Sequence, residues 1–415
     1  MQVTPALRRL SWRHSPQSFV LLAFIIAFFL AVQYLRSIPA ADPSSAFFDP
    51  VRAYERRYSL RRLKEAEEFV YGANTETNGR ASAEPSICVG IASVHRDGAR
   101  YLSTLIGSLL HGLNEQERSD LVLMPFIANV DPQTHEEFNE PWLHNLADHV
   151  LTYESVPATK KTRLRRMQTP SGHREKALFD YSYTLDACLN SSTPYILMLE
   201  DDVLAAEGWF SRTKAALSVL EDRQEFHDSL YLRLFYNTRL HGWNSEFWPY
   251  YLFWSVVFEL LVFVGILLLC YFTAGSRFFT PRATAVTLSM CAPACVALYF
   301  AAGRLTVQPF PSGIHRMDDF GCCSQAFIFP RAQVPPLLDY FGEERVGLRD
   351  VLIEKYASRN HLARWAQTPS VFQHIGSRSS KWKGPGSEVA DKNGKIPTDR
   401  IWHYRFEDWD VEEMQ

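Results

Sequence analysis

The amino-acid sequence predicts an α/β domain that follows an N-terminal membrane anchor and is interrupted by a transmembrane helical hairpin. Apolar residues are concentrated in three blocks, at residues 19–35, 250–274 and 283–302. Elsewhere, short apolar runs alternate with segments whose apolar residues recur at helical spacing, which is typical of an open α/β sheet. The 415 residues are 47% hydrophobic and only 21% charged, and the three blocks account for the apolar excess.

Composition excludes several other classes of protein. The apolar content excludes a disordered chain, and seven cysteines in a chain of this length exclude a disulfide-stapled miniprotein. Lys and Arg number 43 against 46 Asp and Glu, so the chain lacks the basic excess that is typical of a nucleic-acid-binding protein. Composition does not predict an oligomeric state.

The first apolar block is interpreted as a signal anchor over residues 19–36. Residues 19–32 are apolar without interruption, and the next three residues extend the block to about the 17 residues that a spanning helix needs. Basic residues precede the block, and no acidic residue occurs before Asp42. A cleaved signal peptide is the alternative, because residues 40 and 41 are alanines. They lie well past the apolar core, which favours the anchor.

The second and third blocks predict a transmembrane hairpin over residues 248–303. The loop at 275–282 contains two arginines and no acidic residue, so the positive-inside rule makes this loop and the N-terminus cytosolic. Residues 37–247 and 304–415 then lie on the far side of the membrane. Glu259 is the only charge in the second block. We interpret it as a polar residue that is tolerated within the helix bundle. The alternative is that it faces a neighbouring helix or a lipid headgroup.

Four cysteines fall outside the membrane segments: Cys88, Cys188, Cys322 and Cys323. In an oxidising compartment the two adjacent cysteines either bond to each other or pair elsewhere. Asn190 begins the only N-glycosylation sequon, which fits a secretory lumen.

The predicted segments and elements follow from these boundaries. Residues 51–71, rich in Arg and Glu, predict an exposed stem helix, and Gly, Asn, Ser and Pro mark residues 72–86 as a linker. The segments are a cytosolic N-terminus (1–18), anchor (19–36), lumenal stem and linker (37–86), first half-domain (87–247), hairpin (248–303), second half-domain (304–380) and tail (381–415). Strands are expected at 87–92, 121–130, 150–154, 195–199, 229–237, 325–329 and 370–375, and helices at 101–113, 174–189, 208–220 and 348–360.

Three consecutive carboxylates, Glu200, Asp201 and Asp202, directly follow the apolar strand at 195–199. Without a partner they would repel one another, and a divalent cation such as Mn²⁺ or Mg²⁺ removes that difficulty. A solvated acidic turn is the alternative. The end of a buried strand in a lumenal α/β domain is where nucleotide-sugar transferases with the GT-A fold carry their metal motif. We therefore predict Glu200, Asp202 and a late histidine, His374, as metal ligands, with Asp202 essential for catalysis.

Other polar residues near strand ends are candidates for binding the nucleotide sugar. Val94, His95 and Arg96 follow the first strand, where Arg96 is either a donor to a diphosphate or a solvated loop residue. The run from His173 to Lys176 opens the helix before the acidic strand, and one of its cations is expected to face the diphosphate, with Arg174 as the candidate. Glu200 and Asp201 complete this predicted donor site, together with two residues named below.

The chain resembles the Golgi transferases that add N-acetylgalactosamine to the glycan of the glycosylphosphatidylinositol (GPI) anchor. The resemblance covers roughly residues 87–380 and includes the insertion of a hairpin into the catalytic domain. Its motifs are Leu199 to Asp202, Gly321 to Gln325, Gly347 to Asp350, His374 to Gly376, and Ser379 with Ser380. The acidic and His-Ile-Gly motifs also resemble the N-acetylglucosaminyltransferases that branch N-glycans, which lack the hairpin.

The resemblance implies a Golgi multi-pass enzyme that transfers N-acetylgalactosamine from UDP-GalNAc to a mannose of the GPI core. It implies Mn²⁺ and inversion at the anomeric carbon, which needs one general base. Asp350 is the candidate base, with Asp318 and Asp319 as rivals and helix capping as the other role for Asp350. The paired cysteines would shape the loop that presents Ser324 and Gln325 to the sugar.

Two other functions remain open from the sequence. A branching N-acetylglucosaminyltransferase that uses UDP-GlcNAc would share the metal site, and the hairpin is the clearest feature against it. A non-enzymatic membrane scaffold would leave the acidic motif unexplained.

Overall fold

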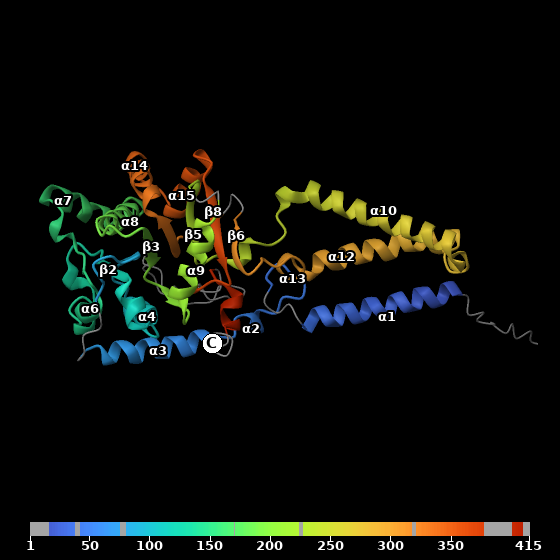
Figure 1. Ribbon diagram of the computed structural model, residues 1–415, viewed down its shortest axis with the longest axis horizontal. Helices are drawn as coiled ribbons and strands as arrows, with labels where there is room; N and C mark the ends of the chain where they lie inside the picture. Colours follow the sequence, from blue (N-terminus) through green and yellow to red (C-terminus); the bar gives the residue numbers. More distant parts are fainter. Residues whose placement is uncertain are drawn as a thin grey trace, which may run out of the picture. The chain divides into compact units, whose positions relative to one another are not determined.

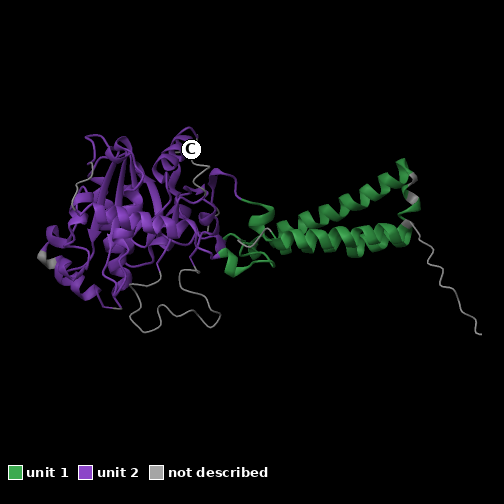
Figure 2. Cartoon of the chain, turned by 90° about the horizontal axis from the view of Figure 1, so that it is seen from below, with its two compact units in different colours: residues 1–53, 241–309 green, residues 54–240, 310–415 purple. Residues whose placement is uncertain are grey.

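The computed structural model describes residues 16–37, 42–74, 80–169, 171–223, 227–317, 321–376 and 401–409. The chain divides into two compact units, shown in different colours in Figure 2. One unit consists of residues 1–53 and 241–309, and the other of residues 54–240 and 310–415. The predicted membrane segments fall in the first unit and the predicted catalytic residues in the second.

The first unit contains the three helices of the described chain that are long and apolar enough to cross a membrane. They are α1 (Pro16–Ser37), α10 (Trp248–Phe272) and the continuous helix Pro281–Ala302. The last is built from α11 (Pro281–Val286), a π-helical turn (Thr287–Cys291) and α12 (Ala292–Ala302). All three predicted apolar blocks are therefore helical. Two short helices, α2 (Pro50–Ala53) and α13 (Arg304–Val307), complete the unit.

The segment that follows the anchor is held against the end of the hairpin within this unit. The Asp42 carboxylate accepts hydrogen bonds from the Thr306 amide at 2.8 Å and from its hydroxyl at 2.9 Å. Gly303 has φ +92°, and a Cβ there would lie 2.3 Å from the Asp42 carboxylate, so both the backbone and the available space require glycine. Glu259 lines a cavity of about 680 Å³ with Pro293 and other residues of the neighbouring helix.

The second unit is built on a mixed seven-stranded sheet with the order β2-β1-β3-β7-β5-β8-β6. β1 is parallel to β2 and β3, and β5 is parallel to β8, whereas β7 and β6 run antiparallel to their neighbours. The strands are β1 (Ile87–Ser93), β2 (Leu121–Ile127), β3 (Tyr195–Glu200), β5 (Ser229–Arg233), β6 (Gly313–Arg316), β7 (Ala326–Pro330) and β8 (Ala363–Thr368). A second, two-stranded sheet pairs β4 (Val203–Ala205) with β9 (Phe372–His374).

Helices cover both faces of the large sheet (Figure 1). On one face lie α4 (Leu102–Leu110) and α9 (Trp209–Glu221), and on the other α8 (His173–Leu189), α14 (Val334–Glu344) and α15 (Arg349–Arg359). Alternate residues of β1 therefore enter different cores, with Val89 facing α4 and Cys88 facing α8. A disulfide joins Cys88 to Cys188 at the end of α8. The other helices are α3 (Tyr58–Gly72), α5 (Glu115–Ser119), α6 (Pro141–Leu146) and α7 (Ala158–Met167).

The stem helix is packed, and the prediction that it is exposed was wrong. Arg62 of α3 is fully buried and donates to the backbone oxygens of Ser108 and Ala205. A Cβ at Gly107 of α4 would lie 2.4 Å from the Ala66 oxygen, so the two helices approach closely. The charged sequence of α3 conceals this contact because Arg62, bound to carbonyl oxygens, occupies one position of the buried stripe that Tyr58, Ala66 and Val70 form. Residues 401–409 of the tail also pack into this unit through aromatic side chains such as Trp402.

Four expected strands are shorter or missing in the structure, and three strands, β4, β6 and β8, were not expected. The strands expected at 121–130 and 229–237 end at Ile127 and Arg233. At 150–154 the chain forms a single bridge between Leu151 and Phe126, followed by a 3₁₀ turn. The strand expected at 370–375 is the shorter β9. The sequence analysis missed β8 because buried polar residues such as Arg364 break its apolar alternation, and it missed β6 because the strand has only four residues.

Candidate active site

The acidic motif lies at the carboxyl end of β3, a central strand of the sheet, as the sequence predicts. The last residue of β3 is Glu200. A turn made by Asp201 and Asp202 follows, and β4 begins at Val203. Ligands of open α/β sheets bind outside the carboxyl ends of parallel strands, and β1 and β3 both end here. The three carboxylates have different partners, which are described in turn below.

Glu200 is bound by two residues from the second half of the domain. Its Oε1 accepts a hydrogen bond from the Ser324 hydroxyl at 2.5 Å and from the Arg349 guanidinium at 2.9 Å. The Glu200 amide donates to the Gln325 oxygen at 3.0 Å. The predicted residues Ser324 and Gln325 therefore contact the acidic motif, and both are buried.

Asp201 is paired with Arg96, which follows β1. The Arg96 guanidinium lies 2.6 Å from Asp201 and 3.7 Å from Asp202. Burial works against the charge of Arg96, but the two carboxylates hold its pKa above the ordinary value. The Ser93 hydroxyl also donates to Asp201 at 2.7 Å. The guanidinium therefore reaches the acidic turn, instead of being a solvated loop residue.

Asp202 lies next to His374, as the sequence analysis predicts. The antiparallel pairing of β4 with β9 sets Val203 opposite His374, so the Asp202 carboxylate comes within 3.6 Å of the imidazole Nε2. Burial opposes both charges, but their mutual attraction outweighs it, lowering the pKa of Asp202 and raising the pKa of His374.

The Asp202–His374 pair has features that fit a divalent cation. Asp202 Oδ1 is buried and has no hydrogen-bond partner in the described part of the chain. At Gly376 a Cβ would lie 2.4 Å from Asp202 and 2.9 Å from His374, so glycine keeps the space beside both groups open. A carboxylate oxygen suits Mn²⁺, and so does the His374 imidazole in its neutral form, so a bound cation would replace the proton that Asp202 favours on His374.

The predicted three-residue ligand set is not assembled. No group of three His, Cys, Asp or Glu side chains among the described residues is arranged to hold a metal. Asp202 and His374 lie 3.6 Å apart, and the Glu200 carboxylate is bound by Ser324 and Arg349.

A polar cavity of about 440 Å³ opens beside this motif. Of the predicted donor-binding residues, the cavity is lined by Val94, His95, Arg96, Glu200 and Asp201. Arg174 is exposed and is not among the lining residues, whereas Lys176 of the same helix is. Lys176 lies 2.7 Å from the Asp180 carboxylate and donates to the Ala128 oxygen at 2.6 Å.

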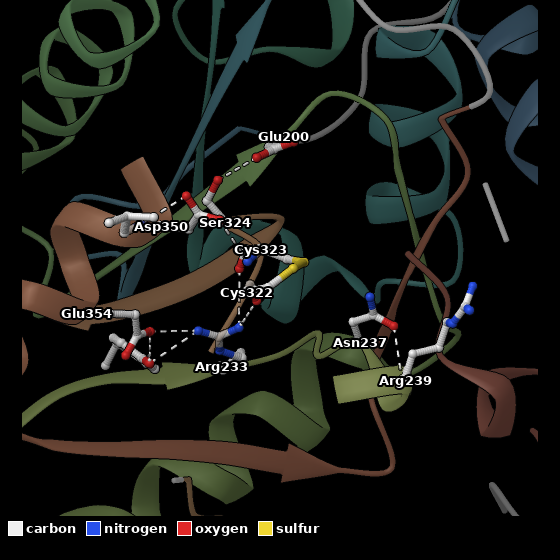
Figure 3. The surroundings of a disulfide bond; sticks show 11 residues. Glu200, Arg233, Asn237, Arg239, Cys322, Cys323, Ser324, Asp350 and Glu354 are labelled. Atoms are coloured by element: carbon white, nitrogen blue, oxygen red, sulfur yellow. Dashed lines mark hydrogen bonds and ion pairs between the residues drawn. A yellow bond between two sulfur atoms is a disulfide. The ribbon is translucent and has the colours of Figure 1, made fainter. Parts of the chain in front are cut away.

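Asp350 lies in the first turn of α15, where its carboxylate accepts a hydrogen bond from the Cys323 amide at 3.2 Å (Figure 3). The N-cap residue of this helix is Leu348, and the Asp350 carboxylate also accepts a hydrogen bond from the Val351 amide of the first turn at 2.9 Å. Cys322 and Cys323 form the vicinal disulfide, one of the two pairings considered. The rival bases Asp318 and Asp319 lie outside the described residues.

Two residues of the site were not identified from the sequence. Arg349 lines the cavity and pairs with Glu200, and its only signal was its position beside Asp350 in a quoted motif. His135 is buried within 3.0 Å of the Ser93 hydroxyl, and burial lowers its pKa to about 4. No local pattern marks His135, which lies in a loop far from the motif in sequence.

Comparison with known proteins shows that the chain is a glycosyltransferase. The relatives include a chicken α-1,6-mannosyl-glycoprotein 4-β-N-acetylglucosaminyltransferase, 27% identical over 147 residues, which are 32% of this chain and 31% of the relative. Mouse α-1,3-mannosyl-glycoprotein 4-β-N-acetylglucosaminyltransferase B is 27% identical over 148 residues, 33% of this chain and 27% of the relative. The chain thus matches about a third of the length of these relatives.

A narrower assignment comes from a protein-family comparison. The family described as GPI-N-acetylgalactosamine transferase PGAP4 matches residues 87–373. This span is more than half of the chain and includes the hairpin as well as both halves of the sheet. The chain belongs to this family.

Proposed function

We propose that the protein transfers N-acetylgalactosamine from UDP-GalNAc to a mannose of the GPI-anchor glycan. The observation that carries this proposal is the family match over residues 87–373, which contains all seven strands of the large sheet and the hairpin between them. The activity is therefore assigned to the whole interrupted domain.

The cavity beside β3 is proposed as the donor site. Arg96, Lys176 and Arg349 line it and can donate charge-assisted hydrogen bonds to the diphosphate of the donor. Asp202 and His374 would hold Mn²⁺ or Mg²⁺, with Glu200 orienting the turn through Ser324 and Arg349. A bound cation would supply positive charge that stabilises the departing diphosphate.

Asp350 is proposed as the general base of an inverting displacement. The acceptor hydroxyl oxygen would bond to the anomeric carbon, the bond from that carbon to UDP would break, and Asp350 would take the hydroxyl proton. The hydrogen bond from the Cys323 amide holds the Asp350 carboxylate in one orientation.

The acceptor and compartment are proposed from the chain's membrane segments. The N-terminus and the loop with Arg277 and Arg282 would be cytosolic, and both halves of the catalytic domain would lie in the Golgi lumen. A disulfide in each half, Cys88–Cys188 and Cys322–Cys323, supports a shared oxidising compartment. An inserted hairpin suits an acceptor that is itself held in the bilayer.

The donor assignment is tested with the purified full-length enzyme, Mn²⁺ and a panel of UDP-sugars, with transfer to a GPI glycan as the readout. The proposal expects UDP-GalNAc to be the preferred donor. Asp202→Ala should abolish transfer while the melting temperature and membrane localisation are retained. If Asp202→Ala transfers at the wild-type rate, Asp202 is not part of the metal site.

A second candidate follows from the relatives, which are named as N-acetylglucosaminyltransferases of mannosyl glycoproteins. The same panel decides between the two. Preference for UDP-GlcNAc, with transfer to an N-glycan and none to a GPI glycan, would replace the GPI assignment.

A further inference from the structure

One tight turn contacts two carboxylates of the proposed site at once (Figure 3). Within the turn, the Cys323 amide donates to Asp350 at 3.2 Å and the Ser324 hydroxyl donates to Glu200 at 2.5 Å. The turn, residues 321–324, therefore connects the end of β3 with the start of α15. Any shift of the turn would move the partners of both carboxylates.

The turn has an unusual backbone that needs support from its surroundings. Cys323 has φ +87°, a conformation that residues with a side chain rarely adopt. Both cysteine carbonyls point at one side chain, the guanidinium of Arg233 in β5. Arg233 donates to the Cys322 oxygen and, at 3.3 Å, to the Cys323 oxygen.

Arg233 is buried beneath the turn and held there by its own partners. Its guanidinium lies 2.8 Å from Glu354 of α15 and packs over the Phe327 ring. A Cβ at Gly321 would lie 2.3 Å from the guanidinium, so the turn rests directly on this side chain. Arg233 is 1% exposed and is not among the residues that line the donor cavity.

We propose that Arg233 is a positioning residue for sugar transfer. It acts without touching the donor, by fixing the 321–324 turn so that the amide of the turn orients Asp350 and its Ser324 hydroxyl orients Glu200. The inference rests on the proposed function, because Asp350 and the end of β3 are assigned their roles there.

The position of Glu354 strengthens this argument. Asp350 and Glu354 are four residues apart and lie on one side of α15, one helical turn from each other. Arg233 thus acts on the proposed base in two ways. It binds the carbonyl of Cys323, whose amide binds Asp350, and its ion pair with Glu354 holds the helix that carries Asp350. A stabilising ion pair alone would not require the contact with the turn.

Two substitutions test the proposal, with a third as a matched control. Arg233→Gln removes the cation that faces both carbonyls. Gly321→Ala keeps every charge but adds a methyl group where the turn meets Arg233. Arg364→Gln is the control, because Arg364 is also buried and lies 2.7 Å from the Glu354 carboxylate, so its substitution removes an ion pair of Glu354 and leaves Arg233 in place.

The readouts are the melting temperature, kcat and KM for the donor, and amide hydrogen exchange of residues 321–325 in the full-length protein. We expect Arg233→Gln and Gly321→Ala to lower kcat by about 10- to 100-fold, since small misplacements of reacting groups cost that much. The KM for the donor should change less than about threefold, because the cavity cations are untouched. Exchange in the turn should accelerate in both variants and not in Arg364→Gln.

The proposal is overturned if turn exchange is unchanged in Arg233→Gln and Gly321→Ala. It is also overturned if Arg364→Gln loses as much kcat as Arg233→Gln at the same melting temperature. If Arg233→Gln does not fold, Gly321→Ala decides by the same criteria. A wild-type enzyme that transfers no sugar from any UDP donor would refute the proposed function instead, and turn exchange would still show whether Arg233 holds the turn.

Discussion

Gly376→Ala is the smallest change that tests the Asp202–His374 site. The added Cβ would lie 2.4 Å from the Asp202 carboxylate and 2.9 Å from His374 Nε2, both closer than the 3.0 Å that real Cβ atoms respect. Ordinary contact begins at 3.4 Å, so the carboxylate has to move by about 1 Å. A misplacement of that size costs about 100-fold in rate, or about 3 kcal/mol of transition-state stabilisation.

The assay is transfer from UDP-GalNAc by the detergent-solubilised enzyme, measured over a range of Mn²⁺ concentrations. We expect kcat/KM to fall by about 100-fold and the Mn²⁺ concentration for half-maximal rate to rise. Gly342→Ala in α14 is the control, because a Cβ there meets nothing within 4 Å. Wild-type rate and Mn²⁺ dependence in Gly376→Ala, at an unchanged melting temperature, would refute a metal role for this pair.

Three further predictions concern the base, the disulfide and acid stability. Asp350→Asn should lower kcat by about 10²- to 10⁴-fold with little change in the KM for the donor, measured by initial rates; an unchanged kcat would exclude Asp350 as the base. Replacing Cys88 and Cys188 together by Ala removes a bridge across 100 residues and should cost about 2–5 kcal/mol in urea unfolding; equal stability would contradict this. Burial lowers the pKa of His315 to about 4 and of His403 to about 3, so both bind protons more tightly when unfolded. The stability that the two neutral histidines contribute is complete above about pH 6.5. The free energy of unfolding should therefore fall by about 4 kcal/mol in total between pH 7 and pH 5, and His403→Asn should roughly halve this loss.

Local patterns predicted those parts of the fold whose stability is local in origin. The apolar blocks are long enough to span a bilayer, and the short apolar run at 195–199 lies between Pro194 and the acidic motif. The helix at 174–189 has apolar residues at helical spacing. The stem helix shows the limit of this approach. Arg62 is read from sequence as solvent-facing, but carbonyl oxygens from two distant segments make its burial favourable.

The candidate site could be predicted where one strand presents it, and less well where distant segments meet. The acidic motif and the later His374 each had a signal in sequence, and the structure brings Asp202 and His374 together. The fate of Glu200 had no such signal, because its partners Ser324 and Arg349 lie more than a hundred residues away. Arg174 and Lys176 show a related limit, since helical phase decides which of two nearby cations faces the cavity.

The charges of the cavity give a physical reason to expect a metal. Three cations that line the cavity are each paired with a carboxylate that also lines it: Arg96 with Asp201, Lys176 with Asp180, and Arg349 with Glu200. These pairs leave no formal positive charge for the two negative charges of a nucleotide diphosphate, and Asp202, 3.7 Å from Arg96, is itself paired with His374. A diphosphate therefore has either to displace buried ion pairs, which is costly, or to bind together with a divalent cation. The second course would use the Asp202 carboxylate, whose buried Oδ1 has no hydrogen-bond partner in the described chain and which lies beside His374 and a glycine that keeps the space open.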